Sequence, residues 1–170
     1  TPISRNGTIN LSPSLSPNQQ EIAWTSFAKG NPDLFVKNLR SGKTRNVSSV
    51  LGVNVSPAWS PDGAKLALAR SGSVDTDIVL IDPNTGALLR SVTRGGGIDV
   101  APSFSPDGRL LAFASERSGG SQIYIADLDT GDVRRVTFQG TFNGDPVFHP
   151  NGDQIAFVGR ERGGFDIFVV

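Results

Sequence analysis

The chain has 170 residues with 16 Lys and Arg, 16 Asp and Glu and a single His, so its formal net charge is zero. The zero net charge disfavours a general nucleic-acid binder, which needs a basic excess. The absence of cysteine excludes disulfides, thiolate metal sites and cysteine nucleophiles, and a single histidine excludes multi-histidine metal centres. The 20 glycines and 11 prolines make turn-forming residues dense, which indicates short strands joined by tight turns.

A sequence unit with a fixed period recurs four times. Each copy opens with a proline, which is followed four residues later by the proline of a turn such as Ser60-Pro-Asp-Gly63. The opening prolines are spaced 44, 45 and 44 residues apart, at Pro13, Pro57, Pro102 and Pro146. An apolar-Ala-apolar triplet begins five residues after each turn proline, at 22–24, 66–68, 111–113 and 155–157. Such a regular period indicates a repeat architecture.

Within each copy we expect four short strands in chain order. The first runs from the opening proline to the residue two positions on, as at 57–59. The turn follows, in which proline presets φ and glycine takes a positive φ. The second strand carries the triplet, as at 65–70, and the third carries a longer apolar run, as at 123–126. A turn at 129–131 then leads to the fourth strand, at 133–137.

The strand pattern predicts an all-β fold. Consecutive apolar residues in the second and third strands indicate burial on both faces, with a core that includes Leu66, Leu68, Leu111, Phe113, Ile155 and Phe157. Four-stranded units at this period are typical of β-propeller blades, so we predict a propeller of four-stranded antiparallel blades. One domain spans 1–170, with blades at about 13–48, 57–93, 102–137 and 146–170. No apolar run is long enough for a transmembrane helix.

The two ends of the chain leave the number of blades open. Residues 2–4 have the spacing of a fourth strand, and the last unit ends at Val170, after its third strand. Residues 2–4 could therefore complete the last blade and close a four-bladed ring. Alternatively, the chain is part of a larger propeller, with unpaired edges that invite pairing with another chain. The absence of methionine leads us to expect a mature or trimmed product.

Motifs that resemble chemical sites are better explained as turns. Asp127–Asp132 resembles the start of a calcium loop but lacks its terminal Glu, and Gly42–Thr44 lacks the first glycine of a phosphate loop. His149 replaces the turn serine of the other copies, and no Gly-x-Ser-x-Gly elbow is present. The charged pairs at 116–117 and 161–162 fall in glycine-rich hairpins. We predict no enzymatic activity, no metal and no cofactor, and a cation in the propeller channel stays open.

Four segments resemble the TolB propeller family of Gram-negative envelopes. They are Asn10–Pro17, Gly30–Val36, Ser56–Gly63 and Gly159–Val169, and the similarity extends over essentially all 170 residues. The family's proteins have a small N-terminal α/β domain followed by a six-bladed propeller. The resemblance therefore implies about four blades of a larger propeller.

The resemblance also implies a function. Such proteins are periplasmic, non-enzymatic components of the Tol-Pal system that bind the peptidoglycan-associated lipoprotein, and other Tol proteins are further possible partners. They support outer-membrane integrity and cell division. Binding occurs at one mouth of the channel, on the loops that lead into each first strand, and short polar side chains suit such recognition. The corresponding residues are Asn10, Ser12, Asn54, Ser56, Asp99, Ala101, Asn143 and Asp145.

Three alternatives stay open at this stage. The same Asn and Asp side chains could cap turns by bonding local backbone rather than bind a partner. The chain could be a structural fragment that binds nothing. It could also be the propeller part of a carbohydrate lyase or a peptidase, although the lyase resemblance implies several metal-binding histidines and the chain has only His149.

Overall fold

The computed structural model describes residues 2–4, 7–71 and 74–170, and its regular elements are all strands. The first two sheets contain β1 (Asn10–Leu15), β2 (Glu21–Ser26), β3 (Asp33–Asn38), β4 (Thr44–Ser48), β5 (Asn54–Trp59), β6 (Leu66–Ser71), β7 (Thr76–Ile81) and β8 (Leu88–Ser91). The other two contain β9 (Asp99–Phe104), β10 (Leu110–Ser115), β11 (Gln122–Asp127), β12 (Val133–Arg135), β13 (Phe142–Phe148), β14 (Ile155–Glu161) and β15 (Gly164–Val169). The all-β prediction is confirmed.

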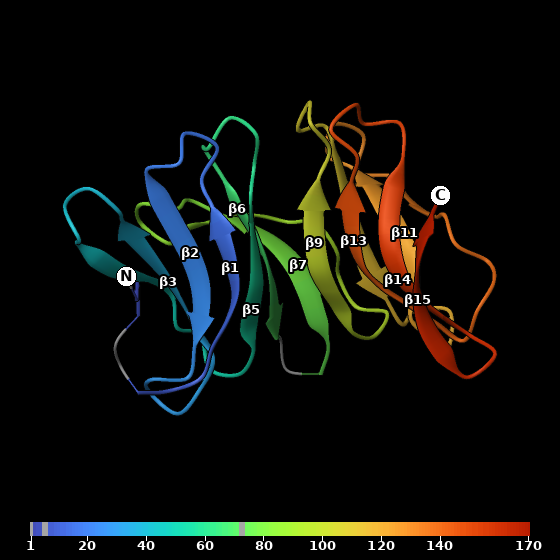
Figure 1. Cartoon of the computed structure of the whole chain (residues 1–170), viewed down its shortest axis with the longest axis horizontal. Coiled ribbons are helices and arrows are strands. Elements are labelled where there is room, and N and C mark those ends of the chain that lie inside the picture. The colour runs from blue at the N-terminus through green and yellow to red at the C-terminus, as the bar shows by residue number, and fades with distance from the viewer. Residues whose placement is uncertain (1, 5–6, 72–73) are drawn as a thin grey trace.

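Each sequence copy forms one antiparallel sheet whose strands follow one another in chain order. Three sheets have four strands and the last, β13-β14-β15, has three. The first strands of the sheets, β1, β5, β9 and β13, contact one another in succession, so the sheets stand side by side around a common axis. Figure 1 shows them as an open arc with the first and last sheets at opposite ends. This arrangement confirms the propeller blades expected from the sequence.

The turn between the first two strands of a sheet is held by its own side chains. Asp62 Oδ1 accepts hydrogen bonds from Ser60 Oγ at 2.5 Å and from the Ala64 amide at 2.9 Å. The bond from Ser60 is the main reason that the pKa of Asp62 is lowered. Gly63 takes the positive φ of 71° that the turn requires. The Ser-Pro-Asp-Gly sequence therefore sets where the second strand begins in the second and third sheets, and the related sequences 16–19 and 149–152 occupy the same turn in the other two.

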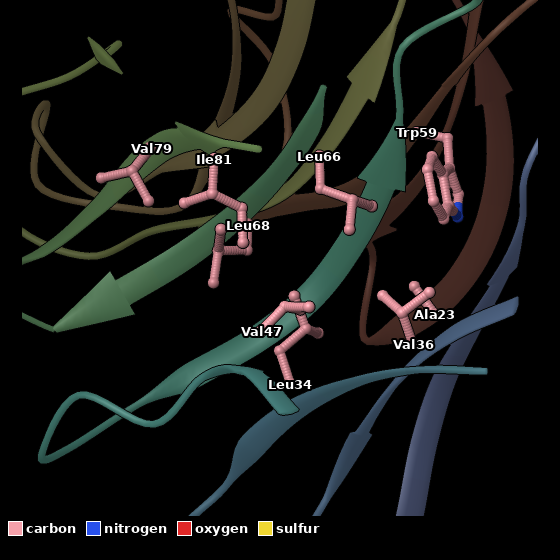
Figure 2. Close-up of a cluster of buried hydrophobic side chains, with 9 residues drawn as sticks. All are labelled: Ala23, Leu34, Val36, Val47, Trp59, Leu66, Leu68, Val79 and Ile81. Atoms are coloured by element: carbon pink, nitrogen blue, oxygen red, sulfur yellow. The ribbon is translucent and has the colours of Figure 1, made fainter. Parts of the chain in front are cut away.

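The core lies between sheets. Figure 2 shows the cluster between the first two sheets, formed by Ala23, Leu34, Val36, Val47, Trp59, Leu66, Leu68, Val79 and Ile81. All six core residues predicted from the triplets are buried. The triplet alanines Ala23, Ala67 and Ala112 are fully buried, and a methyl group at this point lets the neighbouring sheet approach closely.

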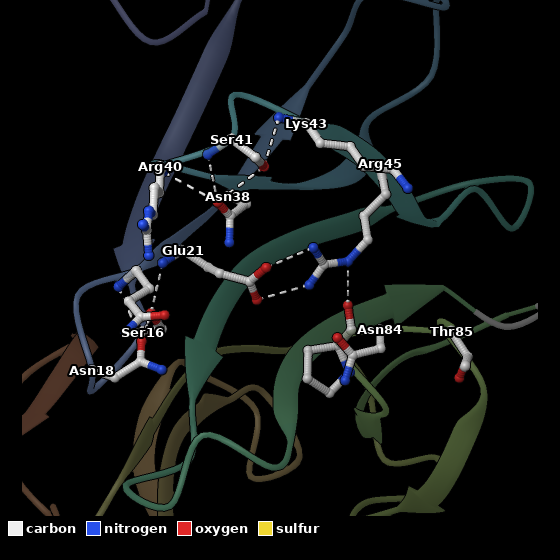
Figure 3. Close-up of polar contacts among 12 residues, drawn as sticks. Ser16, Asn18, Glu21, Asn38, Arg40, Ser41, Lys43, Arg45, Asn84 and Thr85 are labelled. Atoms are coloured by element: carbon white, nitrogen blue, oxygen red, sulfur yellow. Dashed lines mark hydrogen bonds and ion pairs between the residues drawn. The ribbon is translucent and has the colours of Figure 1, made fainter.

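Arginines on the fourth strands link the first three sheets at their outer margin. Arg45 forms a bidentate ion pair with Glu21 at 2.7 and 2.8 Å, and its Nε donates to the Pro83 carbonyl of the next sheet at 2.9 Å (Figure 3). This pairing holds the pKa of Glu21 below its ordinary value. At the equivalent position of the second sheet, Arg90 donates to the Leu128 carbonyl of the third. These arginine hydrogen bonds connect neighbouring blades, in addition to the apolar packing of the core.

The closed four-bladed ring does not form. The described residues 2–4 form no strand, contrary to the sequence-based expectation, and the Ile3 carbonyl instead accepts a hydrogen bond from Lys37 Nζ of the first sheet. The physical reason is that a strand needs a neighbour to pair with, and the last sheet lies at the other end of the arc (Figure 1).

Candidate partner-binding face

The first strands of the four sheets, β1, β5, β9 and β13, all begin on the same side of the arc, and we call them the inner strands. The first residue of each inner strand pairs with the end of the second strand, as Asn10 does with Ser26 and Asp99 with Ser115. The turns between the first and second strands gather on the opposite side, where an added Cβ on Gly108 would lie 3.4 Å from Pro61 of the preceding turn. In Figure 1 these turns are at the top. We call the side that holds the starts of the inner strands and the loops before them the mouth face.

A bulge interrupts every inner strand near the mouth face. The pairing of each first strand with the second strand of its sheet shifts by one residue at the bulge, which contains a proline that cannot donate to the ladder. The residue before each proline adopts a left-handed conformation, with φ between 49° and 55° at Ser12, Ser56, Ala101 and Asp145. These are four of the eight residues that the sequence predicted for the binding face. Ser12 and Asp145 are exposed, and Ser56 and Ala101 are half-buried.

The Asn side chains at the strand starts make hydrogen bonds within the fold. Buried Asn54 accepts a hydrogen bond from Ser48 Oγ at 2.6 Å and donates to the Val50 carbonyl at 2.7 Å. Buried Asn143 likewise donates to the carbonyl four residues earlier, that of Gln139, at 2.8 Å. Half-buried Asn10 accepts from the Trp24 indole at 3.0 Å. These side chains hold the loops between blades in place.

Asp99 differs because it is a buried carboxylate. Its side chain is 0% exposed, and Oδ2 pairs with the Arg117 guanidinium at 2.8 Å. Arg117 also donates from Nε to Ser115 Oγ at 2.8 Å and lies over the rings of Phe113 and Tyr124, 5.3 and 5.0 Å from their centroids. Asp99 Oδ1 is buried and has no hydrogen-bond partner within the described residues. Sequence reasoning placed Arg117 in a solvated hairpin and missed this pair. The Asp that replaces Asn at one of four equivalent positions is the signal that could have revealed it.

The eight predicted residues therefore divide into two groups. Asn54, Asp99 and Asn143 are buried and direct their polar atoms into the protein, so in this conformation they support the mouth face rather than present atoms to a partner. Half-buried Asn10, which accepts from the Trp24 indole, belongs with this supporting group. The four bulge residues form the second group and stand nearer the solvent. The arrangement can recognise a partner by shape and by hydrogen bonds.

The motifs with chemical resemblance lie in turns, as expected. Asp127 Oδ1 accepts from the amides of Asp129 and Thr130, and its Oδ2 accepts from Arg109, which is the main reason that its pKa is lowered. The His149 carbonyl accepts from the Gly152 amide at 2.8 Å. In the described parts of the chain, no three His, Cys, Asp or Glu side chains gather as metal ligands.

Comparison with known proteins decides the family. The sequence profile of the TolB beta propeller domain matches residues 1–170, the whole chain. The chain belongs to the TolB β-propeller family. Its sequence is 41% identical over 92 residues to the "Tol-Pal system protein TolB" of Desulfosudis oleivorans, covering 54% of this chain and 20% of that protein. It is 42% identical over 94 residues to the "Protein TolB homolog" of Chlorobaculum tepidum, covering 55% of this chain and 21% of that protein.

Solved structures agree with the TolB assignment. TolB from Acinetobacter baumannii superposes with a TM-score of 0.87 at 32% identity, covering 95% of this chain and 41% of that protein. A putative TolB from Agrobacterium tumefaciens gives 0.86 at 23% identity, covering 99% and 60%. Puromycin hydrolase gives 0.79 at 17% identity, which shows a shared fold alone. The TolB-family chain thus spans less than half of the Acinetobacter protein, and none of its described residues forms a helix suited to crossing a membrane.

Proposed function

We propose that this chain is a non-enzymatic protein-binding part of a periplasmic Tol-Pal component and that its mouth face binds the peptidoglycan-associated lipoprotein. This interaction would support outer-membrane integrity and cell division, and other Tol proteins are further candidate partners. The proposal rests on membership of the TolB family and on relatives whose names place them in the Tol-Pal system. Recognition of this kind needs no cofactor, and we propose that none is bound.

The observation that carries the proposal is the fourfold bulge. In each blade, one residue near the start of the inner strand has a left-handed backbone conformation. These residues are Ser12, Ser56, Ala101 and Asp145. Buried polar side chains beside each bulge, such as Asn54 and Asp99, hold the backbone in place. Loops displayed by rigid strands can carry recognition at little cost to the fold. A preorganised rim of this kind loses little conformational entropy on binding.

The test measures binding of the soluble domain of the cognate lipoprotein by titration calorimetry. We expect Ser56→Arg and Ala101→Arg to abolish binding with little change in melting temperature, because a long charged side chain fills the rim without entering the core. The matched control is Ala64→Arg, an exposed position in the turn between β5 and β6, on the side opposite the mouth face. It should leave binding unchanged.

Two outcomes would count against the proposal. Equal loss of binding from the mouth variants and from Ala64→Arg would move the site away from the mouth face. If the 170-residue chain fails to bind while a full-length relative binds, then the essential contacts lie outside this chain, which spans 41% of the Acinetobacter protein.

An enzymatic function is the second candidate because puromycin hydrolase shares the fold. The identity of 17% carries no catalytic residue across, and the sequence has no nucleophile elbow. A screen with peptide and pectic-oligomer substrates tests this candidate. Turnover that survives purification to homogeneity would replace the binding function proposed above.

A further inference from the structure

The loops on the side of the mouth face expose large apolar side chains. The hairpins between second and third strands also lie on this side, because the end of each second strand pairs with the start of an inner strand. Leu51, Val74 and Ile98 lie in such loops and hairpins and are 83%, 90% and 48% exposed. In the turns of the opposite side, the described residues include one exposed large apolar side chain, Leu39, at 38%. The two sides therefore differ in the surface that they offer to a partner.

The loop that carries Leu51 lies against the end of β6. The Val53 amide donates a hydrogen bond to Ser71 Oγ at 2.8 Å, and the Ser71 amide donates to the Val53 carbonyl at 2.9 Å. An added Cβ on Gly52 would lie 3.1 Å from the Ser71 side chain. These contacts place Leu51 on one flank of the hairpin between β6 and β7.

The loop that carries Ile98 lies on the other flank of the same hairpin. Thr76, the first residue of β7, forms a parallel bridge with Ile98, and its amide donates to the Gly97 carbonyl at 3.4 Å. Val74 lies in the hairpin, so it stands between the two loops. We call Leu51, Val74 and Ile98 the apolar strip. Isolated exposed apolar residues are common on protein surfaces, but adjacent ones mark interaction sites.

The exposure of the apolar strip does not depend on the ends of the arc. Its residues belong to the second sheet and to the loops that join this sheet to the first and the third. Figure 1 shows the second sheet in the middle of the arc, and its inner strand β5 contacts β1 on one side and β9 on the other. Both neighbouring blades are therefore in place and still leave the strip open.

The apolar strip is continuous with the bulges of the mouth face. Ile98 precedes the bulge residue Ala101 by three positions, and Leu51 precedes the bulge residue Ser56 by five. The residue directly before the Asn or Asp at the strand start is apolar in every copy of the repeat, at Ile9, Val53, Ile98 and Phe142. Protein interfaces commonly combine an apolar centre with polar groups around it. The strip and the bulges together offer both.

We propose that the apolar strip binds an apolar patch on the soluble domain of the peptidoglycan-associated lipoprotein, beside the polar contacts at the bulges. This inference rests on the proposed function, since it assigns further residues to the same binding face. It also specifies the chemistry of the partner, because the lipoprotein surface that meets the second blade has to be apolar. Burial of the strip supplies affinity through the hydrophobic effect, and the bulges orient the partner.

The first test measures the affinity of strip variants for the soluble domain of the lipoprotein by titration calorimetry. We expect Leu51→Ser to weaken binding at least about tenfold, because a leucine side chain that becomes buried is lost. Val74→Ser should weaken binding less, since valine is smaller. Both side chains are more than four-fifths exposed, so the melting temperature should not change. The matched control is Leu89→Ser on the outer strand β8, where the leucine is 51% exposed, and it should bind as the wild type does.

The heat-capacity change of binding is a second readout. Burial of apolar surface gives a negative heat-capacity change. Titrations at several temperatures should therefore give a negative value for the wild-type chain and a value of smaller magnitude for Leu51→Ser. An equal heat-capacity change for the two proteins would overturn the apolar strip as a contact.

The pattern of binding separates this inference from the proposed function. Loss of binding in Ser56→Arg together with wild-type affinity in Leu51→Ser and Val74→Ser would overturn the apolar strip and leave the mouth face as the lipoprotein site. The strip would then be a surface for a part of the full-length protein outside this chain. Equal weakening by Leu89→Ser would also overturn the strip, because the effect would not depend on position. A wild-type chain that does not bind the lipoprotein would overturn both proposals.

Discussion

Replacement of Phe113 by alanine is the most direct test of how the blades pack. Phe113 lies on β10 within the cluster between the second and third sheets, and its side chain is 0% exposed. Its ring stacks on Tyr124 with centroids 6.0 Å apart and lies under the Arg117 guanidinium. The substitution therefore removes a buried ring and two interactions that depend on that ring.

The size of the loss follows from these contacts. A Phe→Ala change in a packed core costs about 3–5 kcal/mol, since the removed atoms lose their burial and a cavity remains. The contacts with Tyr124 and Arg117 place Phe113 toward the upper end of this range. The milder change Phe113→Leu keeps most of the volume and should cost less than about 1.5 kcal/mol.

Denaturant unfolding followed by tryptophan fluorescence measures both variants. The midpoint should fall while the slope with denaturant stays the same, which shows that stability and not the extent of unfolding has changed. A loss below about 1 kcal/mol for Phe113→Ala would refute the assigned packing of β10 between two sheets, because no fully buried ring can be removed at so small a cost.

Three further predictions concern polar and backbone features. Arg117→Met should destabilise the fold by about 3–5 kcal/mol in urea melts, because it leaves the Asp99 carboxylate buried without a counter-charge, whereas Asp99→Asn should cost much less. The pKa of Glu21 is lowered, so its ion pair with Arg45 stabilises the fold above pH 4.5, and this contribution is lost as pH falls through the folded-state pKa. The Arg45→Met variant lacks the ion pair and should therefore lose less stability on acidification, as measured by thermal melts. Gly86→Ala should lower the melting temperature, because φ is 74° and the new Cβ would lie 2.2 Å from a backbone oxygen of β4.

Each of these predictions has a result that contradicts it. Gly42→Ala is the control for the glycine, since its φ is 73° but no atom lies within 4 Å of the added Cβ. Equal destabilisation by Gly86→Ala and Gly42→Ala would show that the contact between sheets is not close. Greater destabilisation by Asp99→Asn than by Arg117→Met would contradict the buried-charge argument. An Arg45→Met variant with an unchanged acid response would contradict the role of the ion pair.

The repeat and its strands were determined by the sequence itself. The Ser60–Gly63 turn specifies its own geometry through a proline, an aspartate that bonds nearby groups and a glycine with positive φ. The buried triplets, such as Leu66–Leu68, are likewise visible because apolar residues on both faces of a strand need cover on both sides. These are local properties, and their regular recurrence was enough to predict the blades.

Which of the mouth-face side chains are buried and which are exposed was decided only by the tertiary structure. Asn54 and Ser56 are two residues apart and look equally suited to binding, but Asn54 is buried because Ser48 and the Val50 carbonyl surround it. Asp99 is buried for a different reason, since Arg117 approaches from another hairpin of the same sheet. Whether a polar side chain faces solvent depends on which groups the neighbouring loops bring to it.

The ends of the arc show the same division. The spacing of residues 2–4 matches a fourth strand, yet in the structure Ile3 lies beside Lys37 and forms no ladder. A strand is stable only when another strand lies alongside to take its hydrogen bonds, and that neighbour is supplied by the arrangement of whole blades in space. The sequence by itself therefore determined which segments can be strands, and the tertiary structure decided which of them have a partner.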